Sequence, residues 1–165
     1  MELSYFNYDK TMQKASIHPS EFFWNGIGDE ILERVLPGTS IYFTELLTFI
    51  KNFTENRIGS EENIDSEPIR IAIWNYTQRL FGIAYEYYNY ADVNYYLSIP
   101  TKTYIKKVAC YPHAVTRNDF WAAMSWLQAT AEEMIHIAAL ITEAKREVEI
   151  LYLVKALKSH LDSFR

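Results

Sequence analysis

Apolar side chains recur at helical spacing along most of the chain, and the most regular run lies near its middle. Its intervals are 4, 3, 4, 3, 4 and 3 residues, and its members are Ile69, Ile73, Tyr76, Leu80, Ile83, Tyr87 and Tyr90. Heptad spacing of this kind is typical of helices that pack side by side at shallow angles. We therefore predict one long helix over residues 67–97, with this run facing the core.

The C-terminal part, from His113 onward, contains neither glycine nor proline and shows the same period. One apolar run consists of Phe120, Met124, Leu127, Ala131, Met134, Ala138 and Ile141. Beyond it a different stripe continues, formed by Ile150, Val154, Leu157, Leu161 and Phe164. The stripes differ by about 100° around the axis, so one straight helix with one neighbour cannot bury both. We predict main helices over 118–142 and 143–163, with a kink, a break or a change of packing partner near Thr142.

Two further helices are predicted in the N-terminal half, where glycine and proline interrupt the chain. One spans residues 41–57, with Ser40 as its N-cap. Its apolar face consists of Tyr42, Leu46, Phe49, Ile50 and Phe53. A shorter piece spans residues 29–36 and ends at Pro37-Gly38, because proline cannot continue a helix.

Three other segments are expected to lack long helices. Residues 1–18 are weakly patterned and are expected to form a flexible arm or a short helix. Residues 59–68 are rich in acidic and small polar side chains, which is typical of a loop. Residues 98–117 contain Pro100 and Pro112, which leave room for only a short helical turn between them.

The periodic signals are all helical, and the alternation of strands and helices that an α/β fold requires is absent. The expected fold class is therefore all-α. We predict an up-and-down helical bundle with four main helices and short N-terminal helical pieces. At 165 residues the chain has the length of one domain, so residues 1–165 are expected to form a single helical-bundle domain.

The chain carries a net charge of −5 and has no long run of lysine or arginine. Nucleic-acid binding is therefore disfavoured, because its affinity comes largely from basic side chains that contact phosphates. An acidic surface instead favours a basic protein partner, which it attracts over long range.

Cellular location is indicated by cysteine usage and by the apolar runs. Cys110 is the only cysteine, so no disulfide can form within the chain, and a reducing compartment is expected. The first residues lack the basic and apolar stretches of a secretory signal. No apolar run reaches the length of a membrane span. These features together predict a cytoplasmic protein.

Aromatic residues are unusually dense between Trp74 and Tyr96, where nine occur. On the predicted helix five of them form a second stripe, about 120° from the heptad run: Trp74, Phe81, Tyr85, Tyr88 and Tyr95. Three interpretations are open. The stripe packs against a second neighbour in the core, or it docks a protein partner, since Tyr and Trp are enriched at interface hot spots. Alternatively, it lines a pocket for an apolar ligand.

Glu133 and His136 have the spacing of metal ligands on a helix. Residues three apart lie on one helix face, so both side chains can reach a single transition-metal ion. Di-metal sites in helical bundles use two such Glu-x-x-His motifs, whereas this chain has one. The alternative is a hydrogen-bonded or surface pair without a metal.

Standard catalytic motifs such as His-Glu-x-x-His, Gly-x-Ser-x-Gly and the phosphate-binding loop are absent from the sequence. With the Tyr-rich stripe, this favours a non-enzymatic protein-interaction module without a cofactor: an inhibitor, an immunity-type protein or a regulatory subunit. The alternative is a metal- or small-ligand-binding protein or enzyme centred on Glu133 and His136. A homodimer is a further hypothesis, because the C-terminal stripes offer two faces and a second copy can cover one.

Overall fold

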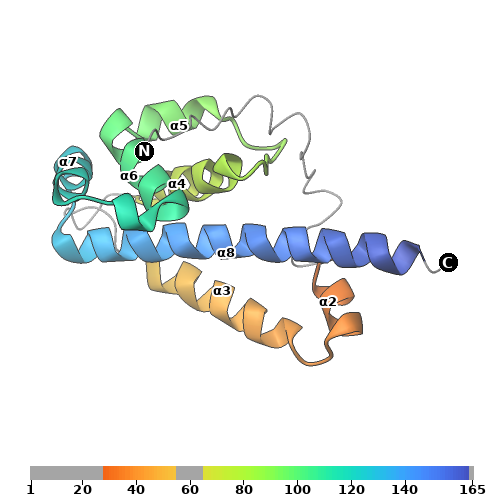
Figure 1. Cartoon of the computed structure of the whole chain (residues 1–165). Helices are drawn as coiled ribbons and strands as arrows, with labels where there is room; N and C mark the ends of the chain where they lie inside the picture. Colours follow the sequence, from red (N-terminus) through yellow and green to blue (C-terminus); the bar gives the residue numbers. More distant parts are fainter. Residues whose placement is uncertain (1–27, 55–64, 164–165) are drawn as a thin grey trace.

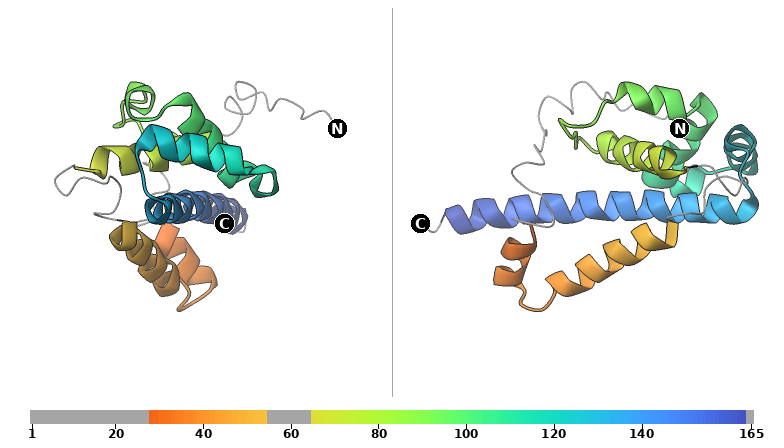
Figure 2. Two further views of the ribbon diagram at one scale, coloured as in Figure 1. Left: turned by 90° about the vertical axis from the view of Figure 1, so that its left-hand side faces the viewer. Right: turned by 180° about the vertical axis from the view of Figure 1, so that it is seen from behind.

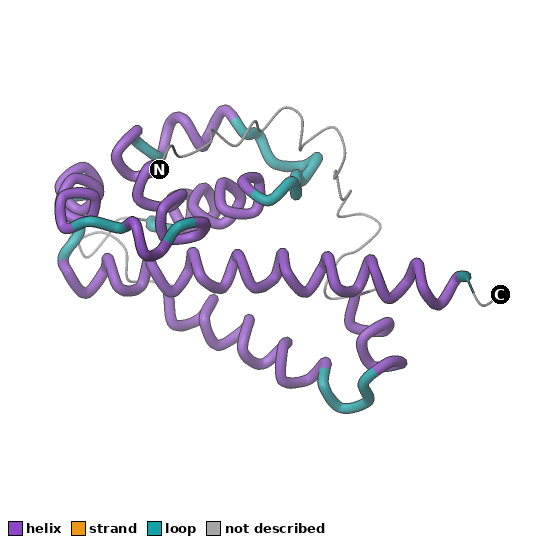
Figure 3. Tube along the Cα trace, in the orientation of Figure 1, coloured by secondary structure: helices purple, strands orange, loops and turns teal. Residues whose placement is uncertain are grey.

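One long helix, α8, organises the fold in the computed structural model, which describes residues 28–54 and 65–163. α8 spans Ala131–Asp162, 32 residues, which is about 48 Å. The helices on one side of it are α4 (Glu67–Leu80), α5 (Ala91–Tyr96), α6 (Ile99–Cys110) and α7 (Arg117–Leu127), with a short 3-10 turn at Pro112–Ala114. The opposite side carries α2 (Asp29–Val35) and α3 (Ser40–Thr54) (Figures 1 and 2). Helices and loops account for the described residues in Figure 3, so the predicted all-α class is confirmed.

Two buried clusters follow the two halves of α8. The first lies among α4 to α8 and includes Met134, Ile137, Leu140 and Ile141 from α8. The second joins α2, α3 and the segment after α4 to Val148, Ile150, Leu151 and Val154 of α8. The helix is continuous through Thr142, so the predicted boundary between 118–142 and 143–163 is wrong. The two apolar stripes reflect a change of packing partner, one of the three predicted explanations.

The single long helix predicted over 67–97 is also wrong, because α4 has only 14 residues. Gly82 has a φ of +85°, a conformation that glycine adopts freely and other residues rarely adopt. The amide of Ile83 then donates to the carbonyl of Gln78 at 3.1 Å, a bond that closes helix C-termini.

This break divides the predicted heptad run between two environments. Ile73 and Leu80 lie on α4 and are buried in the first cluster. Tyr87 lies in the turn that follows α4 and is exposed. A helical period in the sequence therefore continues past the point at which the helix itself ends.

The predicted 118–142 helix is interrupted as well, by the turn between α7 and α8. Gln128 ends α7 in the left-handed region, with a φ of +51°. α8 then begins with a capping box. Thr130 Oγ1 accepts from the Glu133 amide at 3.2 Å, and the Glu133 carboxylate accepts from the Thr130 amide at 2.5 Å.

A helix is present where 41–57 was predicted, but a different face of it is buried. Leu47 is buried, and Phe43 packs against the second cluster. Tyr42 and Phe49, which belong to the face predicted to be buried, are largely exposed. Both faces of α3 carry apolar residues at helical spacing. The pattern alone therefore does not show which of the two apolar stripes contacts α8 and which stays exposed.

Residues 98–117 contain more helix than predicted. Pro100 lies in the first turn of α6, where proline is tolerated because those amides have no partner within the helix. Ser98 caps the same turn, with its Oγ accepting from the Thr101 amide at 3.3 Å. α2 agrees with the piece predicted over 29–36.

The predicted arm over 1–18 and most of the predicted loop over 59–68 lie outside the described residues. The side chain of Phe53 does so too. In the part of the chain that the structure describes, no helix combines the length and the apolar character needed to cross a bilayer.

Candidate partner-binding site

A hollow of about 520 Å³ opens at the surface where α5, α6 and α7 meet. Its lining consists of Asn94, Tyr95, Tyr96, Ser98, Ile99, Pro100, Thr101, Trp126 and Leu127. We call these residues the α5–α7 hollow. None of them is charged, and most are apolar or aromatic. A concave surface with an apolar lining and a few polar groups is typical of a recognition site.

Three large side chains of the α5–α7 hollow project into solvent. Tyr95 is 83% exposed, Ile99 is 80% exposed and Trp126 is 68% exposed. The chain beneath them is anchored, since Leu97 between α5 and α6 is almost fully buried. The Tyr96 ring meets the Tyr95 ring edge-on, with centroids 4.9 Å apart. Apolar groups on an anchored backbone lose less freedom when a partner binds.

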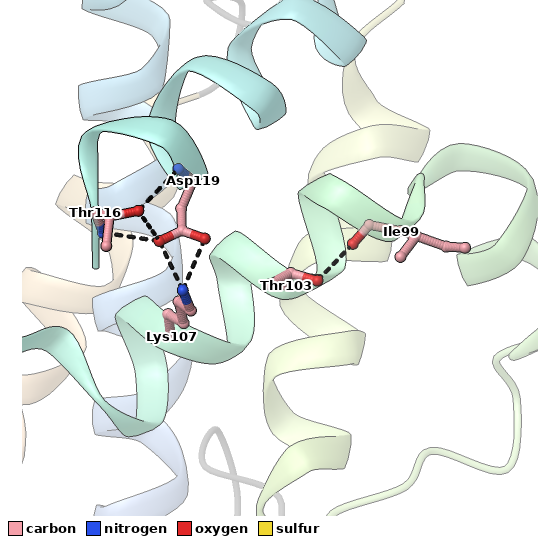
Figure 4. Close-up of polar contacts among 5 residues, drawn as sticks. All are labelled: Ile99, Thr103, Lys107, Thr116 and Asp119. Carbon is pink, nitrogen blue, oxygen red and sulfur yellow. Dashed lines mark hydrogen bonds and ion pairs between the residues drawn. The ribbon is translucent and has the colours of Figure 1, made fainter. Parts of the chain in front are cut away.

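An ion pair joins α6 to α7 at the end away from the hollow (Figure 4). Lys107 Nζ lies 2.8 and 2.7 Å from the two carboxylate oxygens of Asp119. Asp119 also accepts from the Thr116 amide at 2.8 Å. The hydrogen bond from Lys107, followed by those from Thr116, lowers the pKa of Asp119 to about 2. This junction fixes α7 on α6 and so helps to place Trp126 and Ile99 at the same hollow.

The five aromatic residues predicted as a docking stripe do not share one helix face. Tyr85 is buried in the second cluster. Trp74, Phe81 and Tyr88 are half-buried and pack against both clusters. Tyr95 is the exposed member of the five and lines the α5–α7 hollow. Partner binding by these residues stays a prediction, and Tyr95 is the best placed of them.

Ile99 and Trp126 were missed by the sequence reasoning. Ile99 directly precedes a proline and belongs to none of the predicted apolar runs. Trp126 lies next to the apolar run of the predicted 118–142 helix but is not part of it. Large apolar residues that belong to no predicted apolar run are candidates for exposed positions that contact a partner. That signal was available, but the sequence does not show that the two residues meet.

Comparison with known proteins assigns the chain to a family. Residues 1–161 match the family described as PA26 p53-induced protein (sestrin). The chain belongs to the sestrin family. Mouse Sestrin-3 is 30% identical over 161 residues, which cover 94% of this chain and 32% of Sestrin-3. Human Sestrin-2 is 31% identical over 161 residues, which cover 94% of this chain and 33% of Sestrin-2. Sestrin-1 of Macaca fascicularis is 29% identical over 150 residues, which cover 91% of this chain and 30% of that Sestrin-1. The chain therefore spans about a third of the length of these sestrins.

Glu133 and His136 lie in the first turns of α8 in this member of the sestrin family. The Glu133 carboxylate is engaged in the capping box, and His136 is buried. Among the described residues, no group of three or more His, Cys, Asp or Glu is placed to hold a metal ion. Protein metal sites usually supply at least three ligands. Metal binding by Glu133 and His136 stays a prediction.

Buried polar residues connect α4 to α8 in this sestrin-family fold, and the sequence reasoning missed them. Gln78 Nε2 donates to Glu147 Oε2 at 2.7 Å. Burial first, and then the Glu147 carboxylate, raises the pKa of Tyr85 well above its ordinary value. One turn earlier, Arg146 Nη1 lies 3.2 Å from the buried Glu143 carboxylate, whose pKa is raised by burial. The hydrogen bond from Gln78 to Glu147 helps to fix α4 on α8, whereas Arg146 and Glu143 both lie on α8. The available signal was the position of Glu143 and Glu147, which lie at helical spacing between the apolar Leu140 and Leu151.

Proposed function

We propose that this chain is a non-enzymatic regulatory domain that binds a protein partner through the α5–α7 hollow. The observation that carries the proposal is the group formed by Tyr95, Ile99 and Trp126, three large and mostly exposed side chains at one hollow. Contiguous exposed apolar surface is uncommon on monomeric proteins and marks sites of interaction. Tyrosine and tryptophan are also the residues most enriched at interface hot spots.

The chemistry of the hollow indicates what the partner presents. Its lining residues are uncharged, so recognition inside it rests on shape and apolar contact. The net charge of −5 over the whole chain favours a basic partner through long-range attraction. Added salt is therefore expected to slow association more than it weakens the formed complex.

The description of the family as p53-induced supports a regulatory role for the chain. A cytoplasmic location belongs to the same proposal. The homodimer predicted from the two C-terminal stripes loses that particular support, because most of the described residues of each stripe belong to or pack against one of the two buried clusters within one chain. A second copy therefore requires a different surface.

Matched variants test the proposal. The Tyr95→Ala/Trp126→Ala variant removes two exposed rings from the hollow, whereas Trp121→Ala removes a partly exposed ring of α7 that does not line it. Partners captured by the unchanged protein are identified and purified, and binding is measured by calorimetric titration. The double variant is expected to bind at least about 10-fold more weakly, and the Trp121 control within about 2-fold. Full affinity in the double variant would exclude the hollow as the site.

A further inference from the structure

The α2–α3 pair lies on the opposite side of α8 from α5, α6 and α7 (Figures 1 and 2), and it carries a second exposed apolar surface. Tyr42 is 69% exposed, Leu36 and Ile41 are each more than half exposed, and Leu46 is more than a third exposed. Ile41, Tyr42 and Leu46 lie on one side of α3, and Leu36 lies at the α2–α3 corner. We call these four residues the α3 face.

We infer that the α3 face is the surface through which two copies of this chain associate. The exposed parts of its four side chains amount to on the order of 400 Å², the size at which an apolar patch marks a binding site. A stable interface takes about 800 Å² from each partner, and somewhat more than half of that area is apolar. The α3 face thus supplies an apolar centre of the size that a stable dimer needs. The inference is independent of the proposed function, because the α5–α7 hollow lies across α8.

The charges beside the α3 face suit a symmetric pair. Arg34 on α2 and Glu45 on α3 are both exposed, and neither forms an ion pair with another residue that the structure describes. Glu45 is the one charged residue between 40 and 50. In a two-fold interface each contact occurs twice with the roles exchanged. Arg34 of each copy can therefore pair with Glu45 of the other, without like charges meeting.

The corner that presents the α3 face is already ordered within one chain. The Glu33 carboxylate accepts from the Gly38 amide at 2.8 Å and from Ser40 Oγ at 2.7 Å. The hydrogen bond from Ser40, followed by that from Gly38, holds the pKa of Glu33 below its usual range. Beneath the corner, Leu32 and Leu47 are buried in the second cluster. An ordered surface loses less conformational freedom when it binds a second copy.

Sedimentation velocity of the full chain, from about 1 to about 200 µM, tests the inference. We expect the unchanged protein to form dimers as concentration rises. Tyr42→Glu is expected to raise the dimer Kd by at least about 30-fold, because it buries a charge at the centre of the contact. Tyr95→Glu is the matched control, because Tyr95 is even more exposed than Tyr42 and belongs to α5, which lies on the other side of α8. This variant is expected to leave the dimer Kd unchanged.

A charge exchange tests the same geometry by a second route. Glu45→Arg alone is expected to raise the dimer Kd by about 3- to 10-fold, and Arg34→Glu added to it is expected to restore the original value. Helical circular dichroism confirms folding of each variant, and Tyr42→Ser replaces Tyr42→Glu if the latter does not fold. A monomer throughout the concentration range would overturn the inference. Equal effects of Tyr42→Glu and Tyr95→Glu would also overturn it, as would a double charge variant weaker than Glu45→Arg alone.

Discussion

The α6–α7 pair and the α2–α3 pair are built alike but packed differently. In each pair one carboxylate holds the junction: Asp119 accepts from Lys107 and Thr116, and Glu33 accepts from Gly38 and Ser40. α6 and α7 then pack among α4 and α8 and share the first buried cluster. α2 and α3 pack mainly on α8, which is the main neighbour of α3.

The difference shows how much the number of neighbours determines exposure. α6 has neighbours on several sides, so its apolar residues are covered except at the open end, where Ile99 lies in the hollow. α3 has its main neighbour on one side, so the adjacent apolar stripe with Ile41 and Tyr42 stays exposed. Local hydrogen bonding can hold a helix pair in place, whereas burial of a second face requires another helix across it.

The largest expected effect compares one deeply buried residue from each pair. Ile105→Ala on α6 should lower the free energy of unfolding by about 4 kcal/mol, because it leaves a cavity enclosed by several helices. Leu47→Ala on α3 should lower it by about 2 kcal/mol, because that site can relax toward solvent. Urea unfolding measures both. Equal costs would show that the α2–α3 pair is as tightly enclosed as the α6–α7 pair.

Within residues 28–54 and 65–163, Gly38 and Gly82 both have positive φ, and they offer a matched pair of smaller effects. Gly82→Ala should lower the free energy of unfolding by about 2 kcal/mol, because the left-handed backbone is strained for alanine and the site is buried. Gly38→Ala should cost about 1 kcal/mol, because its φ of +81° brings the same strain but an added Cβ meets open space. Thermal unfolding compares them, and a costlier Gly38→Ala would contradict the looser packing assigned to the α2–α3 corner.

Asp119→Asn should lower the free energy of unfolding by about 1 kcal/mol through loss of the Lys107 pair and the α7 cap. The pH dependence has a definite sign. The pKa of Asp119 is lower in the folded protein, about 2, than its ordinary 3.8. Its stabilisation is therefore complete above pH 3.8 and is lost as pH falls through about 2. Acid titration of stability should show a smaller loss over this range in the variant. Identical profiles would mean that the ion pair contributes nothing measurable to this pair of helices.

The smallest expected effect concerns Glu133, at the turn that joins the α6–α7 pair to α8. Glu133→Ala should lower the free energy of unfolding by about 0.5 kcal/mol, because it removes one of the two capping bonds with Thr130. Elemental analysis of untagged protein tests the other role predicted for Glu133. Metal near one equivalent that disappears in both Glu133→Ala and His136→Ala would establish a metal site, whatever the change in stability.

Local signals for two helix ends were present in the sequence, although periodicity concealed them. Gly82 followed by the apolar Ile83 is the pattern of a helix C-terminus, and Thr130 followed by Glu133 is that of a capping box. Each lies inside a run with continuous heptad spacing, which predicted an unbroken helix. Capping acts on the backbone within a single turn, so it can end a helix while the apolar period continues beyond it.

The candidate site was predictable only in part. Tyr95 was identified through its aromatic neighbours, whereas Ile99 and Trp126 come from two other helices. Their meeting depends on how α6 lies against α7, which the Lys107 and Asp119 contact helps to set. Residues so far apart in the chain that line one hollow leave no periodic trace in either segment.

The sequence alone determined that this chain is helical, which stretches favour helix, and which residues can form apolar faces. Those properties depend on side-chain propensity and spacing over a few turns. Tertiary structure alone decided which faces are buried. On α3 the stripe with Leu47 contacts α8 while the stripe with Tyr42 remains in water, although both satisfy the same helical period. Burial is a property of two surfaces in contact, so it is settled only when the fold places a second helix opposite the first.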